Sequence, residues 1–307
     1  MRPWLLWTVG AVVSWGVWAL LGKLVGDTLS PALTQALSTI GILPVLLFMA
    51  FSIKLSQRTQ EETQRLLDKS CERNRLRGAV FAFGAGMLTC LGNVAYYEVL
   101  NHGAKAATVV PLTALYPVVT ILLAMLFLKE RLNHIQFAGL ALSLCAIYLF
   151  NVQQEQGFLS SWLLVALIPI ALWGVAGLLQ KVATNHISGE LSTLWFLAAF
   201  VPVALYILLR SPLPSEISSG KWLLVIALGF TFALGNFALL AAFASHGKAS
   251  IIAPLAALYP VVSIPIAILL LHERVGWRET VGIAFALISA VALSWETRAP
   301  SEAAIPT

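Results

Sequence analysis

The chain has 307 residues, of which 59% are hydrophobic and only 11% charged, and its mean hydropathy is +0.86. Soluble domains are nearer a quarter charged, so this composition excludes a globule with a water-compatible surface. The net charge of +5 is best interpreted through its distribution among loops, and it does not indicate a nucleic-acid partner. The cysteines Cys71, Cys90 and Cys145 have no CxxC spacing, so neither a disulfide framework nor a metal site is predicted.

Ten segments are apolar over about the 20 residues that a helix needs to cross a bilayer. They cover about 4–25, 31–53, 78–99, 104–128, 135–152, 160–183, 189–209, 221–244, 249–271 and 278–295. No small-residue cleavage site follows the first, so we interpret it as a retained helix and not as a signal peptide. Most connections are too short to hold a soluble domain. We therefore expect an all-α integral membrane protein with ten transmembrane helices.

One connection, residues 54–77, is long and polar, with seven Lys or Arg and four Asp or Glu. With ten spans both termini share a side, and that side receives 13 Lys and Arg against 6 on the other. Because positive residues favour the cytoplasmic side, both termini are predicted to be cytoplasmic, in an inner or plasma membrane. Without 54–77 the tally is 6 to 6, so the predicted orientation depends on this segment.

An internal repeat organises the chain, since residues 105–131 return at 248–274, 143 positions later. Other pairs share this offset or one of 158: Pro111 with Pro254, Tyr116-Pro117 with Tyr259-Pro260, Asn93 with Asn236 and Gly139 with Gly282 at 143, and Trp15-Gly16 with Trp173-Gly174 at 158. The 15-residue difference is absorbed most simply in 54–77. The sequence thus predicts two five-helix units, 1–152 and 153–300, before a polar tail, 301–307.

An odd number of helices in each unit makes the second unit enter the membrane from the opposite side. The two units are then inverted repeats, an arrangement typical of secondary transporters. The chain has no GxxxxGK[ST] sequence, so an ATP-driven pump is not predicted. The expected mechanism is alternating access, in which the two units exchange slightly different shapes.

The repeated segments resemble the EamA-type permeases of the drug/metabolite transporter (DMT) superfamily. The residues that carry the resemblance are Glu130-Arg131 and Glu273-Arg274 after the TALYPVV and AALYPVV runs, together with the Trp-Gly pairs and Gly139 with Gly282. The resemblance implies a cavity lined mainly by spans 1, 3, 4, 6, 8 and 9. It also implies that spans 5 and 10 are peripheral and a contact for a homodimer. Members export or exchange amino acids, other metabolites, nucleotide sugars or sugar phosphates.

The candidate cavity residues are those whose chemistry is unusual for an apolar span. They are Trp15, Trp18, Lys23, Asn93, Tyr96, Tyr97, Glu98, Lys105, Pro111, Tyr116, Trp173, Lys181, Asn236, Lys248, Pro254 and Tyr259. A proline frees a backbone carbonyl, which either faces the cargo or belongs to a fixed kink. The two amides either contact the cargo or join helices. The rings either line a cavity or lie in the interfacial belt.

The ionisable candidates have two interpretations as well. The lysines at both ends of the spans either attract an anionic cargo or extend to lipid headgroups. Glu98 is either a proton-coupling or gating group, or the partner of a lysine. We interpret Glu130, Arg131, Glu273 and Arg274 as structural anchors at helix ends.

The function expected from these features is secondary transport of a small organic metabolite, such as an amino-acid-like, sugar-phosphate-like or other amphipathic solute. Its direction is export or exchange, and its partners are the solute and the lipid bilayer. An enzyme is not expected, because carboxylates, histidines and nucleophiles do not converge at membrane depth, and no cofactor is predicted. The alternative is a membrane-embedded lipid-handling protein, either a scramblase or an enzyme.

Overall fold

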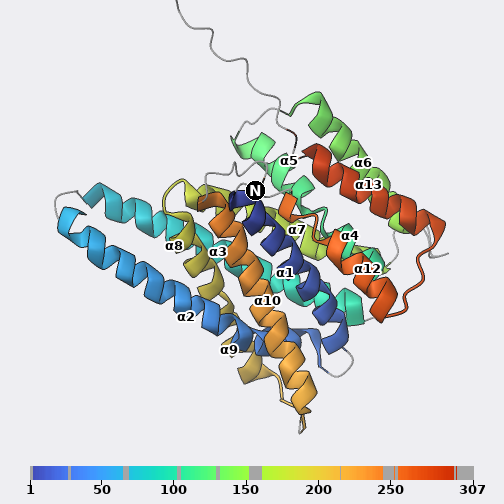
Figure 1. The fold of residues 1–307 in the computed structure, drawn as a ribbon, viewed down its shortest axis with the longest axis horizontal. Helices are drawn as coiled ribbons and strands as arrows, with labels where there is room; N and C mark the ends of the chain where they lie inside the picture. The colour runs from blue at the N-terminus through green and yellow to red at the C-terminus, as the bar shows by residue number, and fades with distance from the viewer. Residues whose placement is uncertain are drawn as a thin grey trace, which may run out of the picture.

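The computed structural model describes residues 3–26, 29–64, 69–101, 105–128, 132–151, 161–214, 216–244, 252, 255–293 and 295. At 53–74 and in a few other helical residues it describes the backbone alone. Throughout these residues the regular structure is helical (Figure 1). The helices are α1 (Pro3–Val25), α2 (Pro31–Gln64), α3 (Lys69–Asn101), α4 (Ala106–Thr113), α5 (Tyr116–Leu128), α6 (His134–Asn151), α7 (Ser161–Thr184), α8 (Gly189–Ala198), α9 (Phe200–Arg210), α10 (Ser219–Ala244), α12 (Pro260–Leu270) and α13 (Trp277–Leu293).

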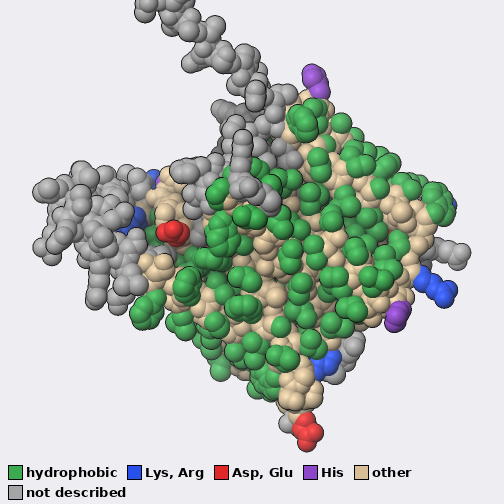
Figure 2. Space-filling model, viewed as in Figure 1, with side chains coloured by type: hydrophobic (Ala, Val, Ile, Leu, Met, Phe, Trp, Pro, Cys, Tyr) green, Lys and Arg blue, Asp and Glu red, His purple; other side chains and the backbone are tan. Residues whose placement is uncertain are grey.

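The described helices overlap the predicted membrane spans, the ninth of which (249–271) is described only in part. Among the described residues, seven helical segments are long and apolar enough to cross a bilayer, with α4–α5 and α8–α9 each forming one of them. The segments α6, α12 and α13 are shorter, so the ten-span topology stays a prediction. Figure 2 shows a face covered by hydrophobic side chains, with the charged ones near its edges. An apolar surface of this extent is suited to lipid and not to water.

The fourth and ninth predicted spans are interrupted where the sequence has its Tyr-Pro pairs. The helix stops after Thr113 and resumes at Tyr116, and in the other repeat a turn at 257–259 precedes α12. Pro117 and Pro260 have no N–H to donate, so the regular hydrogen-bond ladder cannot continue through them. A tighter turn replaces it, in which Val118 N donates to Leu115 O over 3.0 Å. The second repeat has the same turn, with 2.9 Å between Val261 N and Leu258 O.

The polar connection 54–77 is largely helical and not an open loop. The helix α2 continues to Gln64 and α3 begins at Lys69, although the apolar spans within them are Pro31–Ser52 and Arg75–Asn101. Both helices therefore extend beyond their apolar parts, and in Figure 1 these ends reach out together on one side of the molecule. Residues such as Gln, Glu, Arg and Leu favour helix even where no core covers them.

The most extensive helix contacts join one half of the chain to the other. The first helix of each half packs against the third helix of the other half, giving the pairs α1–α10 and α3–α7. The second helices follow the same rule, since α2 packs on α10 and α8 on α3. Glycines allow these last two approaches: a Cβ on Gly229 would meet Ser38 O, and one on Gly86 would meet Phe196 O.

Those contacts show where the two offsets of the repeat, 143 and 158, give way to each other, and so where the first half has 15 extra residues. Gly86 and Gly229 differ by 143 positions, whereas their contacts Ser38 and Phe196 differ by 158. The offset therefore changes after Ser38 and before Gly86, a stretch that contains the extended ends of α2 and α3. The fifth helices also pair, because α6 packs on α13 with Gly139 against Leu293 and Gly282 against Phe150.

Candidate functional site

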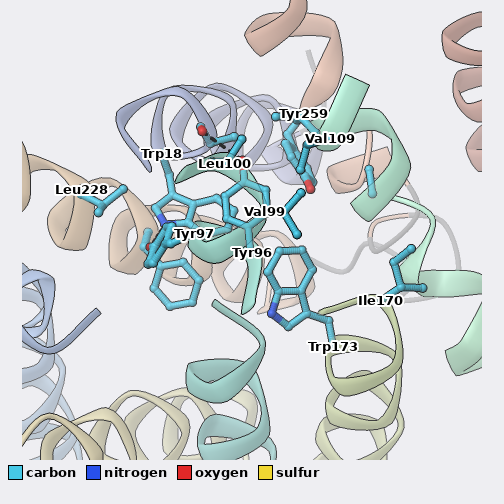
Figure 3. Packing of buried hydrophobic residues seen from close by; sticks show 14 of the residues in the cluster. Trp18, Tyr96, Tyr97, Val99, Leu100, Val109, Ile170, Trp173, Leu228 and Tyr259 are labelled. Atoms are coloured by element: carbon cyan, nitrogen blue, oxygen red, sulfur yellow. Dashed lines mark hydrogen bonds between the residues drawn. The ribbon is translucent and has the colours of Figure 1, made fainter. Parts of the chain in front are cut away.

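Aromatic rings fill the region where helices of both halves meet (Figure 3). Trp18 stacks on Tyr96 with 5.2 Å between ring centroids, and it also contacts Trp173 at 5.9 Å and Phe232 at 5.4 Å. Trp18 Nε1 donates to Tyr97 Oη over 3.0 Å. Tyr96 Oη donates to the backbone carbonyl of Ala19, also over 3.0 Å. Four sequence-predicted cavity residues (Trp18, Tyr96, Tyr97 and Trp173) therefore pack against one another here.

The repeated tryptophans fit against the repeated glycines of the opposite half. An added Cβ on Gly92 would lie 2.5 Å from Trp173 Nε1, and one on Gly235 would lie 2.4 Å from Trp15 Cδ1. Both distances are far below normal carbon contacts, so only glycine leaves room for the indole. The repeat in the sequence pairs these two glycines, but it does not predict that each accommodates a ring from the other half.

The glycine after each tryptophan makes a second reciprocal contact. A Cβ on Gly16 would lie 2.6 Å from Val262 Cβ and 3.0 Å from the Tyr259 carbonyl oxygen. On Gly174 it would lie 2.4 Å from Val119 Cβ and 3.0 Å from the Tyr116 carbonyl oxygen. Each Trp-Gly pair is therefore packed against the interrupted helix of the opposite repeat, beside its Tyr-Pro turn.

Two neighbouring polar atoms in this region have no hydrogen-bond partner among the described residues: the indole N–H of Trp15 and the hydroxyl of Tyr259. Their rings lie edge to face, with centroids 6.4 Å apart. The Tyr259 side chain lies near Thr113, but Thr113 Oγ1 already donates to Val109 O and Val110 O, and no hydrogen bond of normal geometry joins the two hydroxyls. Buried polar atoms usually have partners, so these two groups are exceptions and candidates for contact with a bound molecule.

The two halves differ in how they satisfy the equivalent groups. Trp173 Nε1 donates to the carbonyl of Thr89 over 3.4 Å. The equivalent carbonyl in the other half is that of Phe232, and Asn236 Nδ2 donates to it over 2.8 Å. Asn236 therefore joins backbone within its own helix, while Asn93 Oδ1 is buried without a partner among the described residues.

A partly buried cluster of charges joins α4 to the start of α13, with Glu279 buried and Lys105 exposed. Lys105 Nζ lies 3.0 Å from Glu279 Oε1 and donates to the carbonyl of Arg274 over 2.9 Å. Thr108 Oγ1 donates to Glu279 Oε1 over 3.1 Å. The carboxylate of Glu273 accepts from the first two N–H groups of α4, those of Ala106 and Ala107, both over 2.8 Å. A carboxylate in this position complements the positive end of the helix dipole.

The remaining candidate residues are spread over the ends and walls of the bundle. Lys23 donates to the carbonyl of Leu100 over 2.8 Å, Lys181 is exposed at the end of α7, and Glu98 is half-buried on α3. Pro111 is buried in α4, and Tyr116 contacts Trp173 edge to face with 6.1 Å between centroids. Glu130, Arg131, Lys248 and Pro254 lie outside the described residues. The anchoring and cavity roles of all these residues stay predictions.

Sequence reasoning missed Glu279, which is 3% exposed, and Thr108, which is 7% exposed. A signal for Glu279 exists in the repeat: the position 143 residues earlier holds Gln136, so the two halves differ there in charge. No group of His, Cys, Asp and Glu suited to a metal is found in the described part of the chain.

The comparisons with known proteins agree with the repeat. A profile described as the EamA-like transporter family matches residues 2–152 and again residues 160–295. An uncharacterized protein of Methanocaldococcus jannaschii is 36% identical over 72 residues, which are 24% of this chain and 52% of that protein, so the match spans about half that relative's length. A solved crystal structure superposes with a TM-score of 0.61 over 94% of both chains at 18% identity, a likeness that shows the fold alone.

Proposed function

Because the chain belongs to the EamA-like transporter family, and is thus a membrane transport protein and not an enzyme, we propose that it moves a small organic metabolite by alternating access. Transport is export or exchange, and two inverted five-helix repeats, 1–152 and 153–300, carry it out. The cargo path lies between the repeats, among the aromatic and polar residues on α1, α3, α4, α7, α10 and α12. Both termini are on the cytoplasmic side.

The observation that carries this proposal is the reciprocal packing of the Trp-Gly pairs. The same contact is made twice, once by α1 on α12 and once by α7 on α5. Two copies of one interface can take slightly different arrangements and exchange them, which would open the path first to one side and then to the other. The interrupted helices lie at both copies of this interface, where a broken hydrogen-bond ladder makes bending least costly.

The unpartnered donors indicate the chemistry of the cargo. Trp15 Nε1 and Tyr259 Oη would donate to acceptor oxygens of a solute, while the flat rings around them would cover an apolar part. A site that combines apolar walls with a few polar groups suits an amphipathic organic molecule. The lysines Lys23, Lys105, Lys181 and Lys248 stand near the ends of their spans, where they would attract a solute that carries a carboxylate or phosphate.

Counterflow in proteoliposomes tests the proposal. Vesicles loaded with one unlabelled amino acid, sugar phosphate or nucleotide sugar are mixed with a labelled trace of the same solute, together with a fluorescent lipid that reports flipping. We expect labelled solute to accumulate transiently for at least one member of the panel. The transport proposal is wrong if no solute exchanges while the lipid reporter flips, an outcome that would favour a scramblase.

A matched pair of variants examines the site itself. Tyr259→Phe removes a hydroxyl that has no partner among the described residues, so we expect exchange to weaken by about tenfold while stability is kept. Arg278→Gln changes an exposed residue whose guanidinium lies over Trp277, and exchange should not change. Equal exchange by both variants would remove Tyr259 from the cargo site.

A further inference from the structure

The charged cluster between α4 and the start of α13 contains the acid Glu279, whereas the repeat places the neutral Gln136 at the equivalent position at the start of α6. Glu279 and Gln136 occupy the same repeat position, and both close the first turn of their helix. Glu279 Oε2 accepts from Gly276 N over 2.7 Å, and Gln136 Oε1 accepts from Asn133 N over 3.1 Å. The capping role is therefore shared, so it does not explain why one side chain is an acid.

Among the residues that the structure describes, the contacts beyond the cap differ between the two positions. Glu279 bonds to Lys105 and Thr108 on the interrupted helix of the opposite repeat. Gln136 Nε2 instead donates to the carbonyl of Leu293, at the far end of α13. The sequence difference extends to the partner, because the position equivalent to Thr108 is Ile251, which has no hydroxyl to donate.

We propose that Lys105, Thr108, Glu273 and Glu279 form a latch that closes the end of the molecule where α4 begins, and that this end is held shut more firmly than the opposite one. This inference rests on the proposed alternating access. The latch joins the first half of the chain, through α4, to the second half, through α13 and the residues before it. The positive-inside prediction places this end on the side opposite the termini, so the resting carrier is closed to the outside.

Burial explains why this contact is firm. The side chain of Glu279 is 5% exposed, so its charge is removed from water and depends on Lys105, Thr108 and Gly276 N for compensation. Separating α4 from α13 would leave that carboxylate without two of these partners until water entered. Glu273 adds a second connection in the same place, because its carboxylate holds the first two N–H groups of α4.

Opening of this end can be measured with a cysteine placed behind the latch. Ala114 is buried at the break that ends α4, about 12 Å from the latch at 1.5 Å per residue. The variant Ala114→Cys is made in a chain in which Cys71, Cys90 and Cys145 are replaced by serine. It is reconstituted into vesicles, and a membrane-impermeant maleimide is added to either side, with the orientation of the chains determined separately.

The decisive change is Glu279→Gln, which gives this end the residue that the other repeat already uses at its cap. We expect the rate of labelling from the α4 side to rise by about tenfold or more, because a charge-assisted contact is lost while the cap is kept. Lys105→Gln changes a residue that is 43% exposed and should act in the same direction, which covers the case in which Glu279→Gln does not fold. Glu216→Gln, an exposed acid on the loop before α10, should leave the rate unchanged.

The outcomes separate this inference from the transport proposal. If Ala114→Cys is labelled but Glu279→Gln and Lys105→Gln react no faster than the parent from the α4 side, the latch is wrong and alternating access is unaffected. If Ala114→Cys is labelled from neither side in any variant, no path reaches the centre and the transport proposal itself fails. Gln136→Glu, the mirror change, should not speed labelling from the side where α6 begins, and faster labelling there would contradict a latch built on this acid.

Discussion

At Gly92 and Gly235 the absence of one methyl group decides whether an indole ring fits between two helices. The ring comes from the opposite repeat in both cases, so these glycines determine how closely the halves approach. Not every glycine of these helices is in such a tight contact. On α3, a Cβ on Gly84 would meet only Leu179 Cδ1 at 3.9 Å, an ordinary contact distance.

Gly92→Ala and Gly235→Ala should each destabilise the protein by about 1–3 kcal/mol, because the new methyl group overlaps Trp173 or Trp15. Gly84→Ala is the matched control and should be neutral or slightly stabilising, since alanine favours helix and space is available. Thermal unfolding of the purified proteins in detergent measures the difference. Equal melting temperatures for Gly92→Ala and Gly84→Ala would contradict this packing.

Tyr97→Phe should lower stability by about 1 kcal/mol, because it leaves the buried Trp18 N–H without its acceptor. Tyr259→Phe removes a hydroxyl that accepts and donates no such bond and should have little effect on unfolding. The same melting measurement compares the two variants. A larger loss for Tyr259→Phe would show that its hydroxyl has a structural partner.

At the scale of elements, the short helix α4 owes its position to residues far away in the sequence. It has eight residues, too few to be stable alone, and Lys105 before it supplies no side-chain cap. Glu273 takes that capping role from a position 167 residues later, through Ala106 N. The sequence predicts an anchor at Glu273 from the repeated Glu-Arg pair, but the place where it binds follows from the packing of one half of the chain against the other.

Glu273→Ala should loosen the first turn of α4 and cost about 1–2 kcal/mol, because two N–H groups lose a charged acceptor. Glu273→Gln keeps one acceptor oxygen and should cost less. Hydrogen exchange followed by mass spectrometry locates the effect, which should concentrate in peptides that contain Ala106 and Ala107. Uniform exchange throughout the protein would indicate general destabilisation and not the loss of a cap.

The sequence alone predicts the helices and the repeat, because the apolar segments and the recurring residues can be recognised without knowing which parts of the chain touch. It could not pair Trp15 with Gly235, or Lys105 with Glu279, because each pair joins different halves and depends on the fold. It also treated 54–77 as a connection, whereas most of it continues α2 and α3 as helix. Low hydropathy marks where a span leaves the bilayer, but it does not mark where a helix ends.

At the scale of the whole molecule, the predicted orientation in the membrane depends on one segment. In the predicted ten-span topology the two sides carry 13 and 6 Lys or Arg residues, and the excess lies entirely in 54–77. Its seven positive residues are Lys54, Arg58, Arg65, Lys69, Arg73, Arg75 and Arg77. Positive residues near the ends of spans favour retention on the cytoplasmic side.

Replacing these seven residues with glutamine should give a mixture of two orientations, since the remaining counts are 6 and 6. A reporter fused to the terminus and active on only one side of the membrane measures the proportions. Replacing Lys23, Lys105, Arg210, Lys221, Arg274 and Arg278 on the other side is the control and should keep the termini cytoplasmic. A single orientation after the first change would show that another feature directs insertion.

The exchange of helix partners between the halves also determines the order in which the protein can be completed during synthesis. When α3 leaves the ribosome, its main partner α7 has not been made, because 59 residues separate Asn101 from Ser161. Gly92 and Gly86 of α3, which in the finished protein contact the Trp173 indole and the Phe196 carbonyl, therefore face lipid until the second half is inserted. The first half cannot complete its packing before the second is inserted, because α1 and α3 find their main partners, α10 and α7, only there.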